Sequence, residues 1–200
     1  IKNLGVECID YSLERNSLNP LADLKTLLNF VKVFTSENPD IVLAYTIKPV
    51  VFGGLASRLF KFNFYALITG LGFTFQGDSY KRKFLTKLVV FLYKAALKKS
   101  KAVIFQNIEN GNMFIEKGII PKSKIHVVNG SGVDIKKFKV VSLPKGKIHF
   151  LCISRLLSEK GLREYAAAAK IVKIKFPDAE FDLVGPEDAS PDAILLNEVD

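Results

Sequence analysis

The sequence predicts an α/β fold in which a parallel sheet is covered by helices on both faces and is followed by the first part of a second such sheet. Short apolar runs alternate with longer stretches whose apolar residues recur at helical spacing, and this alternation is typical of parallel sheets with crossover helices. The 200 residues are 48% hydrophobic and 24% charged, as in a soluble globular chain of one or two domains. Because no apolar run reaches about 18 residues and the first residues do not resemble a signal peptide, we expect no membrane span and no export.

The first part of the chain predicts five strands and four helices. A helix is expected over 19–37, because Asn19 can cap it and Pro20 suits its first turn. The helix over 108–118 is expected to end at Gly118. The remaining helices are expected over 49–60 and 79–101, and the strands over 5–13, 40–46, 62–69, 101–107 and 123–128.

The same alternation starts again near Lys147. We expect a strand over 147–155, a helix over 162–176, a strand over 179–185 and a helix that begins at Pro191. Residues 138–147 contain a proline and a glycine and show no periodicity, so we interpret them as a linker.

The linker predicts two domains of unequal size, 1–143 and 144–200. A doubly wound sheet usually has about five or six strands, so the second domain is expected to be incomplete. The first domain is expected to lack its initial strand, loop and helix. The two cysteines, Cys8 and Cys152, lie in strand-like runs without metal-ligand spacing, and we interpret both as reduced core residues.

Positive charge is concentrated in one predicted helix. The chain carries a net charge of +9, and residues 79–101 contain eight cations and no acid. The cations are Lys81, Arg82, Lys83, Lys87, Lys94, Lys98, Lys99 and Lys101. Two compatible interpretations remain open: a core-packed helix with its lysines in water, or a helix at an anionic lipid surface, where each nearby cation contributes about 1 kcal/mol.

Residues 155–161 read RLLSEKG and lie between a predicted strand and a predicted helix. A joint of this kind directs backbone N–H groups and the positive end of the helix dipole toward one place, where an anion can bind. Arg155 leaves the strand, Lys160 follows in the loop and Gly161 begins the helix. The pattern therefore predicts an anion site with two side-chain cations.

Several motifs, taken in order, resemble glycosyltransferase family 4, and more narrowly the bacterial sugar transferases that build lipid-linked oligosaccharides, capsule or O-antigen. They are NPLADLKTL, PDIVLAYTIKP, FGGLASRL, ITGLGFTF, VIFQNIENGNMFIEKG, VNGSGVDIKKF and the segment from FLCISRLLSEKG to FDLVG. The resemblance covers nearly the whole chain and implies the GT-B architecture. Two Rossmann-like domains then face each other, the first on the acceptor side and the second holding most of the nucleotide-sugar donor.

The resemblance also implies roles for individual residues. Arg155 and Lys160 correspond to the cations that hold the donor diphosphate, and they are the expected catalytic residues, because fixed cations offset the negative charge that grows on the leaving group. Gly161 and Gly185 are expected on the donor side, although turn chemistry explains Gly185 equally well.

On the acceptor side, the resemblance points to glycines at two loops. Thr69, Gly70 and Gly72 follow a strand and are candidates for backbone contacts to the acceptor or the donor sugar. Gly130 and Gly132 are expected to form a hinge and cleft wall, or a plain turn. Many relatives carry a histidine where Gly70 stands, so the role of that histidine does not transfer. The expected membrane-surface residues are Lys81, Arg82, Lys83, Lys87 and Lys94.

The implied function is sugar transfer by a retaining, metal-independent hexosyltransferase. A nucleotide sugar, expected to be a UDP sugar, would donate to a polyprenyl-diphosphate-linked glycan acceptor at the inner face of the bacterial membrane, with the protein cytoplasmic and peripheral. No cofactor or metal is expected, since the sequence shows no DxD pair. The family's E-x7-E element is expected beyond Asp200, so this chain is expected to be inactive alone.

Two alternatives remain. One is a nucleotide-sugar 2-epimerase of the same architecture. The other is a non-catalytic basic α/β module that binds nucleic acid, although nucleic acid is not an expected partner, because no aromatic residues are interleaved with the cations on a sheet face. The absence of Ser/His/Asp order, a P-loop and a GxGxxG after a strand disfavours hydrolase, kinase and dehydrogenase functions.

Overall fold

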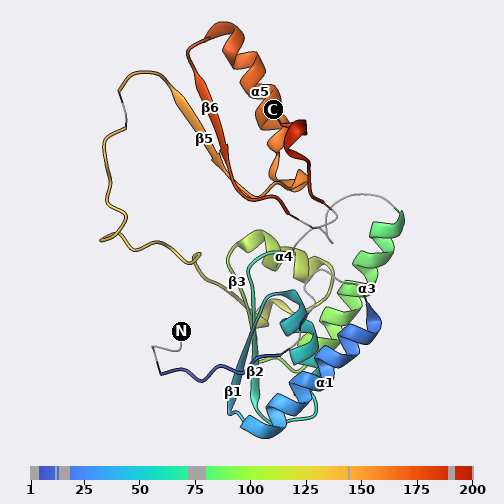
Figure 1. Cartoon of the computed structure of the whole chain (residues 1–200). Coiled ribbons are helices and arrows are strands. Elements are labelled where there is room, and N and C mark those ends of the chain that lie inside the picture. The colour runs from blue at the N-terminus through green and yellow to red at the C-terminus, as the bar shows by residue number, and fades with distance from the viewer. Residues whose placement is uncertain are drawn as a thin grey trace. The chain divides into compact units, whose positions relative to one another are not determined.

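The computed structural model describes residues 5–11, 13, 19–71, 80–143, 145–188 and 192–199. The chain divides into two compact units, Ile1–Val133 (unit 1) and Asp134–Asp200 (unit 2) (Figure 1). The predicted boundary after residue 143 falls within the irregular segment that opens unit 2. Each unit is described by itself.

Unit 1 contains a parallel sheet of four strands, as the sequence predicts. The strands are β1 (Ile41–Tyr45), β2 (Asn63–Ile68), β3 (Ala102–Phe105) and β4 (Ile125–Val127). They pair in the order β1-β2-β3-β4, and every pairing is parallel. In the register of the sheet, Leu43 lies beside Tyr65 and Tyr65 beside Ala102.

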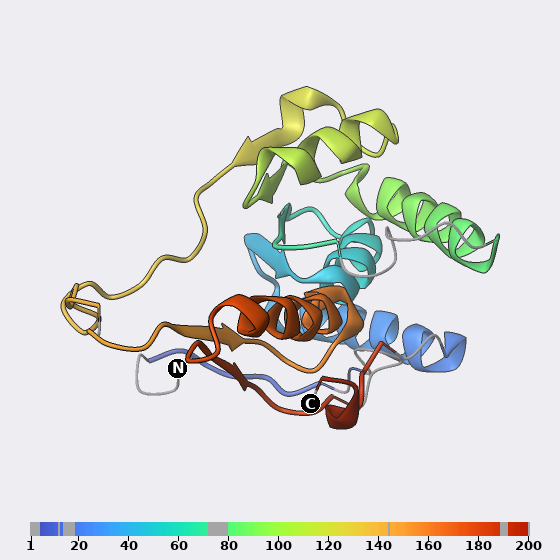
Figure 2. The ribbon, with the colours of Figure 1, turned by 90° about the horizontal axis from the view of Figure 1, so that it is seen from above.

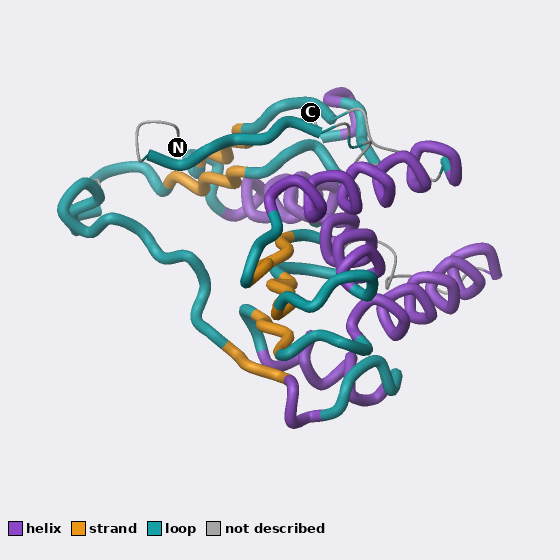
Figure 3. Tube along the Cα trace, turned by 90° about the horizontal axis from the view of Figure 1, so that it is seen from below, coloured by secondary structure: helices purple, strands orange, loops and turns teal. Residues whose placement is uncertain are grey.

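The connecting helices of unit 1 also follow the predicted order. They are α1 (Pro20–Glu37), the π-helical turn η2 (Pro49–Gly53), which continues into α2 (Gly54–Ser57), α3 (Tyr80–Leu97), α4 (Ile108–Glu116) and the 3-10 turn η4 (Lys122–Lys124). Figures 2 and 3 show these helices gathered on one side of the β1–β4 sheet.

The prediction of helices on both faces is therefore wrong for the described part of unit 1. Each strand pairs with the next along the chain, and a right-handed crossover that always steps in one direction places every connecting helix on the same face. Burial agrees with this arrangement. Phe64, Ala66 and Phe105 point into the core beneath the helices, whereas Ile41 and Leu43 on the other face are exposed.

The core of unit 1 is built from large apolar side chains between the sheet and the helices. Tyr93 and Phe105 each pack edge-on against Phe114, with ring centroids 5.0 Å apart in both pairs. Leu97 and Val50 are fully buried in the same cluster. This core fixes the strands whose carboxyl ends form one edge of the sheet.

Local capping signals are confirmed. The Leu21 N–H donates to Asn19 Oδ1 at 3.0 Å at the start of α1, where Pro20 occupies the first turn. Gly118 follows α4 with a left-handed φ of 58°, and the Ile119 N–H donates back to Phe114 O at 2.8 Å. Both helix ends are therefore set by local chemistry.

The strand predicted over 5–13 is wrong for the described residues 5–11, which pair with no other strand and are exposed. Cys8, expected in the core, is exposed for the same reason, whereas Cys152 is half-buried in unit 2; both are free thiols. An apolar alternation becomes a strand only when a neighbouring strand satisfies its backbone groups.

Unit 2 holds two parallel strands and one long helix. Strands β5 (His149–Ile153) and β6 (Glu180–Val184) pair directly, and α5 (Leu162–Lys175) crosses between them. Two 3-10 turns, η5 (Ser158–Lys160) and η6 (Leu196–Glu198), complete the unit. A small core of Leu156, Leu162 and Ile194 packs against Cys152. The predicted helix start at Pro191 lies outside the described residues.

Across the described ranges of both units, no helix is both long enough and apolar enough to cross a bilayer.

Candidate functional site

The loop between β5 and α5 contains the predicted cations of unit 2. Its backbone is fixed from both sides: the Leu156 N–H donates to Pro186 O, and the Ile194 N–H donates to Leu156 O, both at 3.1 Å. Leu156 and Leu157 are buried. The loop is therefore a rigid connection at the carboxyl end of β5, the edge where open α/β sheets bind ligands.

Gly161 joins the loop to α5 in the way the sequence predicts. It adopts a left-handed φ of 69° and directly precedes the first residue of α5. Glycine is the residue that adopts this conformation at least cost. Because Gly161 has no side chain, it contributes no capping group to the N–H groups of the first turn, which are the groups that bind anions at helix starts.

Arg155 is held by a carboxylate from the loop after β6. Its Nη1 donates to Asp188 Oδ2 at 2.7 Å; the Arg155 side chain is 58% exposed and that of Asp188 13%. A guanidinium carries five N–H donors in a fixed fork. Asp188 thus binds one of these donors.

Lys160 also lies beside an acid. Its Nζ is 3.3 Å from Glu159 Oε1. The backbone N–H of Glu159 donates to Asp192 Oδ2 at 3.1 Å, which ties the η5 turn to the segment before η6. Each predicted donor-binding cation is therefore paired with a carboxylate of its own unit, and an incoming anion would share these cations with the acids.

A third cation, Arg163, stands on the first turn of α5. Its Nε donates to Glu198 Oε2 at 2.8 Å, and its Nη1 donates to Ser158 Oγ at 2.9 Å. The N–H of Leu195 and the Arg163 guanidinium, in that order, lower the pKa of Glu198 below its ordinary value. Arg163 on α5 thus connects η5 with η6 and stabilises the loop between β5 and α5.

Sequence reasoning missed Asp188, Arg163 and Glu198. The two acids are 33 and 35 positions from the arginines that they bind. No local spacing signals such a pair, because it exists only when β6 and the segment after it fold back beside the loop.

Gly185, predicted on the donor side, is explained by a close approach of backbones. A Cβ at this position would overlap Ser154 O and C, and the Ser154 N–H donates to Val184 O at 2.9 Å. The space that the missing side chain leaves is thus filled by the end of β5. Contact of Gly185 with the donor stays a prediction.

In unit 1, Thr69 and Gly70 follow β2 at the carboxyl edge of the sheet, as predicted, whereas Gly72 lies outside the described residues. Among the described residues, no atom lies within 4 Å of a Cβ placed on Gly70. Packing against these residues therefore does not require glycine there.

Two further features stand at the same edge, and sequence reasoning missed both. Thr46, directly after β1, adopts a left-handed φ of 71°, which is strained for a β-branched residue. Lys48 Nζ lies 2.7 Å from Asp23 Oδ1 on the first turn of α1, and both side chains are largely buried. Strain and a partly buried ion pair are typical of functional edges, but neither has a sequence signature.

The loop after β4 carries the predicted hinge glycines. Gly132 adopts a left-handed φ of 67°, and a Cβ on Gly130 would meet nothing within 4 Å in the described part of the chain. The turn that follows is capped by Asp134, since the Lys136 N–H donates to Asp134 Oδ1 at 2.9 Å. The hinge role itself stays a prediction.

The basic helix forms as α3. Lys83, Lys87 and Lys94 are exposed on it. Lys81 and Arg82 belong to the same helix, but their side chains lie outside the described part of the structure.

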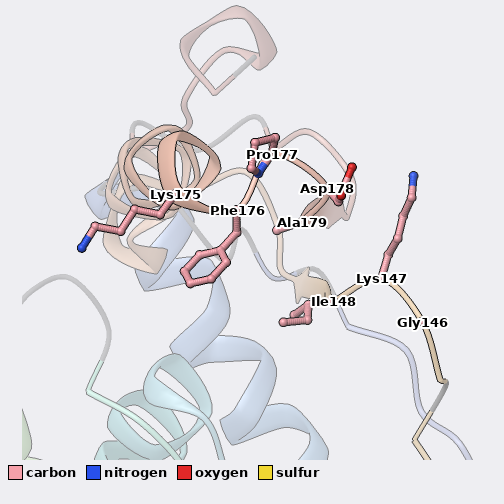
Figure 4. A pocket seen from close by; sticks show the side chains of 8 residues that line it. All are labelled: Gly146, Lys147, Ile148, Lys175, Phe176, Pro177, Asp178 and Ala179. Carbon is pink, nitrogen blue, oxygen red and sulfur yellow. The ribbon is translucent and has the colours of Figure 1, made fainter.

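Unit 2 also has an open hollow of about 500 Å³ at the amino ends of β5 and β6, opposite the RLLSEKG loop. Figure 4 shows the side chains of Phe176 and Ile148 beneath it, while Lys147 and Lys175 point outward on opposite sides. The cations do not converge on this hollow, and it lies at the edge away from the predicted chemistry.

Among the described residues, no group of three or more His, Cys, Asp and Glu side chains is placed to hold a metal ion. The expectation that the reaction needs no metal and no cofactor stays a prediction.

Comparison with known proteins identifies the family of this chain. A family described as "Glycosyl transferase 4-like" matches residues 1–107. An N,N'-diacetylbacillosaminyl-diphospho-undecaprenol alpha-1,3-N-acetylgalactosaminyltransferase of Campylobacter jejuni is 30% identical over 98% of this chain and 55% of its own length. A UDP-Gal:alpha-D-GlcNAc-diphosphoundecaprenol alpha-1,3-galactosyltransferase of Escherichia coli is 27% identical over 92% of this chain and 48% of its own length. The chain spans about half the length of the curated relatives it matches.

Solved structures support the fold. The chain resembles MnaA of S. aureus with UDP (TM-score 0.53, 16% identity, covering 92% of this chain and 48% of that one). It also resembles the UDP-GlcNAc 2-epimerase of Neisseria meningitidis with UDP-GlcNAc (TM-score 0.54, 15% identity, covering 94% of this chain and 51% of that one). A glycosyltransferase of Rickettsia africae gives a TM-score of 0.50 at 18% identity, covering 90% and 55%. At such identities these likenesses show the fold alone, and they confirm the α/β fold of GT-B type, of which this chain covers about half.

Proposed function

The chain belongs to the glycosyltransferase family described as Glycosyl transferase 4-like, and we propose that it takes part in moving a sugar from a nucleotide sugar to a lipid-linked glycan. The observation that carries this proposal is the match, over nearly the whole chain, with two sugar transferases whose names both specify a diphosphoundecaprenol-linked substrate. The acceptor class proposed here is accordingly a glycan on a polyprenyl diphosphate.

We place the donor diphosphate at the RLLSEKG loop. Arg155 and Lys160 lie on a fixed backbone at the carboxyl end of β5, and the start of α5 supplies backbone N–H groups beside them. As the bond between sugar and diphosphate breaks, negative charge grows on the departing diphosphate. Cations that are already in position lower the energy of that state more than the energy of the bound donor.

Asp188 has a positioning role in this proposal. The bond from Arg155 Nη1 to Asp188 Oδ2 holds the guanidinium plane, so less side-chain freedom is lost when the remaining donors bind phosphate oxygens. Glu159 has the same relation to Lys160. Transfer by retention, without metal and from a UDP sugar, completes the proposed reaction.

We place the acceptor at the carboxyl edge of unit 1. Thr69 and Gly70 follow β2, with no described atom within 4 Å of a Cβ placed on Gly70, and Gly130 and Gly132 follow β4. The Asp23–Lys48 ion pair fixes the start of α1 at the same edge. The proposed location is the inner surface of the bacterial membrane, where an acceptor linked to a polyprenyl diphosphate is held by the bilayer.

The donor site can be tested by measuring the Tm of the chain with and without UDP. UDP is expected to raise the Tm of the chain, and the Arg155→Ala, Lys160→Ala double variant is expected to lose this shift. Each charge-assisted hydrogen bond contributes about 1.5–3 kcal/mol, so each single variant should weaken UDP binding roughly ten- to a hundred-fold.

Lys175→Ala is the matched control. Lys175 is an exposed cation at the other end of α5, so its removal lowers the net charge by the same amount as one of the two test substitutions and should leave the UDP shift unchanged. An unchanged shift in the double variant, or an equal loss in the control, would place the donor site elsewhere.

A further inference from the structure

Helix α3 exposes a stripe of apolar side chains that the core of unit 1 does not use. Phe84 is 73% exposed, Leu88 45% and Phe91 66%. The three positions are spaced by four and three residues, so they lie on one side of the helix. Tyr93 and Leu97, on the inner side, are fully buried, which shows that α3 already has its packing partner.

A stripe of cations runs beside this apolar stripe. Lys83, Lys87 and Lys94 are exposed, and their spacing of four and seven residues places them on one line along the helix. Lys83 and Lys87 directly precede Phe84 and Leu88 in the sequence, so the two stripes are neighbours on the same outer surface. Cations and large apolar groups thus share one exposed face.

Positive charge continues beyond the end of α3. Lys124 Nζ donates to Lys98 O at 3.0 Å, and Lys99 Nζ donates to Arg58 O at 3.3 Å. Burial and, after it, the charge of Lys101 lower the pKa of Lys124. The sequence of α3 contains no acid, so the partner that complements this face is anionic.

We propose that α3 docks on an anionic lipid bilayer, with Phe84, Leu88 and Phe91 inserted below the headgroups and Lys83, Lys87 and Lys94 bound to lipid phosphates. An exposed face that is apolar along one side and cationic along the other fits the boundary between headgroups and acyl chains. Because the proposed acceptor is linked to a membrane lipid, this docking surface rests on the proposed function. The proposed docking therefore includes insertion of apolar side chains into the bilayer as well as attraction between lysines and lipid phosphates.

The absence of tryptophan from the chain makes a direct test possible. Phe91→Trp introduces a single tryptophan into the apolar stripe, and Phe176→Trp introduces one at a position of unit 2 that is 58% exposed. With vesicles of phosphatidylcholine and phosphatidylglycerol, the emission of the first variant should shift to the blue and should be quenched by brominated acyl chains. The second variant should show neither effect, and vesicles of phosphatidylcholine alone should shift neither.

Further substitutions in the Phe91→Trp background separate insertion from attraction. Phe84→Ser with Leu88→Ser should weaken vesicle binding at least about tenfold, because the two largest remaining apolar contacts are lost. Lys83→Gln with Lys87→Gln should weaken it by a similar factor and should reduce its dependence on salt.

Three results would overturn the proposal: vesicle binding without a blue shift, equal shifts in the two tryptophan variants, or no binding at low salt. A blue shift without vesicles, together with a dimer in sedimentation, would assign the face to a second copy and would overturn it as well. The vesicles contain neither donor nor acceptor, so this outcome is independent of the UDP experiment, which alone decides the donor site.

Discussion

Tyr93 is a buried residue of unit 1 whose hydroxyl group lowers the stability of the fold. Its ring packs against Phe114 in the core, but its hydroxyl, within the described part of the chain, is buried without a hydrogen-bond partner. Burial raises the pKa of Tyr93 far above its ordinary value. A buried hydroxyl that loses its water without replacement opposes folding.

Tyr93→Phe should therefore stabilise unit 1. Removing an unsatisfied hydroxyl while the ring remains should raise the free energy of unfolding by about 1 kcal/mol, measured by urea denaturation followed by circular dichroism. Tyr45→Phe, on the exposed face of β1, is the control and should change stability by less than about 0.5 kcal/mol. A loss of stability in Tyr93→Phe would show that the hydroxyl has a partner.

At the scale of elements, α2 and α3 approach each other closely at Gly54. A Cβ on Gly54 would lie 2.8 Å from Ala96 O and 3.0 Å from Ala96 Cβ. The two helices thus meet almost backbone to backbone, and the small residues at both positions allow it. This contact sets how closely α3 lies over the sheet, and hence which of its sides remains outside.

Gly54→Ala should separate these helices. Overpacking of a well-filled contact costs about 1–3 kcal/mol, so the variant should unfold at a lower urea concentration. The neighbouring Gly53→Ala is the control. Its Cβ would make ordinary contacts of 3.8 and 3.9 Å with the rings of Phe64 and Phe34, and alanine is the better helix former. Equal destabilisation by both substitutions would contradict the assigned role of Gly54.

At the scale of the whole molecule, unit 2 opens with an exposed segment that joins it to unit 1 and whose described residues form no regular strand or helix. Val140, Val141 and Leu143 are almost fully exposed in it. Both candidate ligand edges, that of unit 1 and that of unit 2, are built entirely within their own units. A cut in the joining segment should therefore leave the local structure of each edge intact.

Limited digestion with trypsin should cut first after Lys139 and Lys145. Both lysines lie in the exposed, irregular segment, where a protease can bind the backbone in extended form. Mass spectrometry of the early fragments identifies the cut sites, and Lys139→Gln with Lys145→Gln should delay them. Lys170, exposed but within α5, serves as the internal reference; cutting there first would contradict the division into two units.

Features that depend on neighbouring residues could be predicted from the amino-acid sequence. The alternation of strands and helices, the cap at Asn19, the stop at Gly118 and the glycine that opens α5 were all predicted, because each follows from side-chain chemistry within one turn. The RLLSEKG loop was placed between a strand and a helix for the same reason. The resemblance to sugar transferases was also present in the order of the motifs.

The neighbours of these residues in space became known from the folded structure. It paired Arg155 with Asp188, placed Gly54 against Ala96, filled the space at Gly185 with Ser154, left Cys8 exposed and put the helices of unit 1 on one face. Each of these outcomes joins segments that are distant in sequence or depends on the direction of successive crossovers. Such contacts form only when the chain folds back on itself, so no local pattern of residues encodes them.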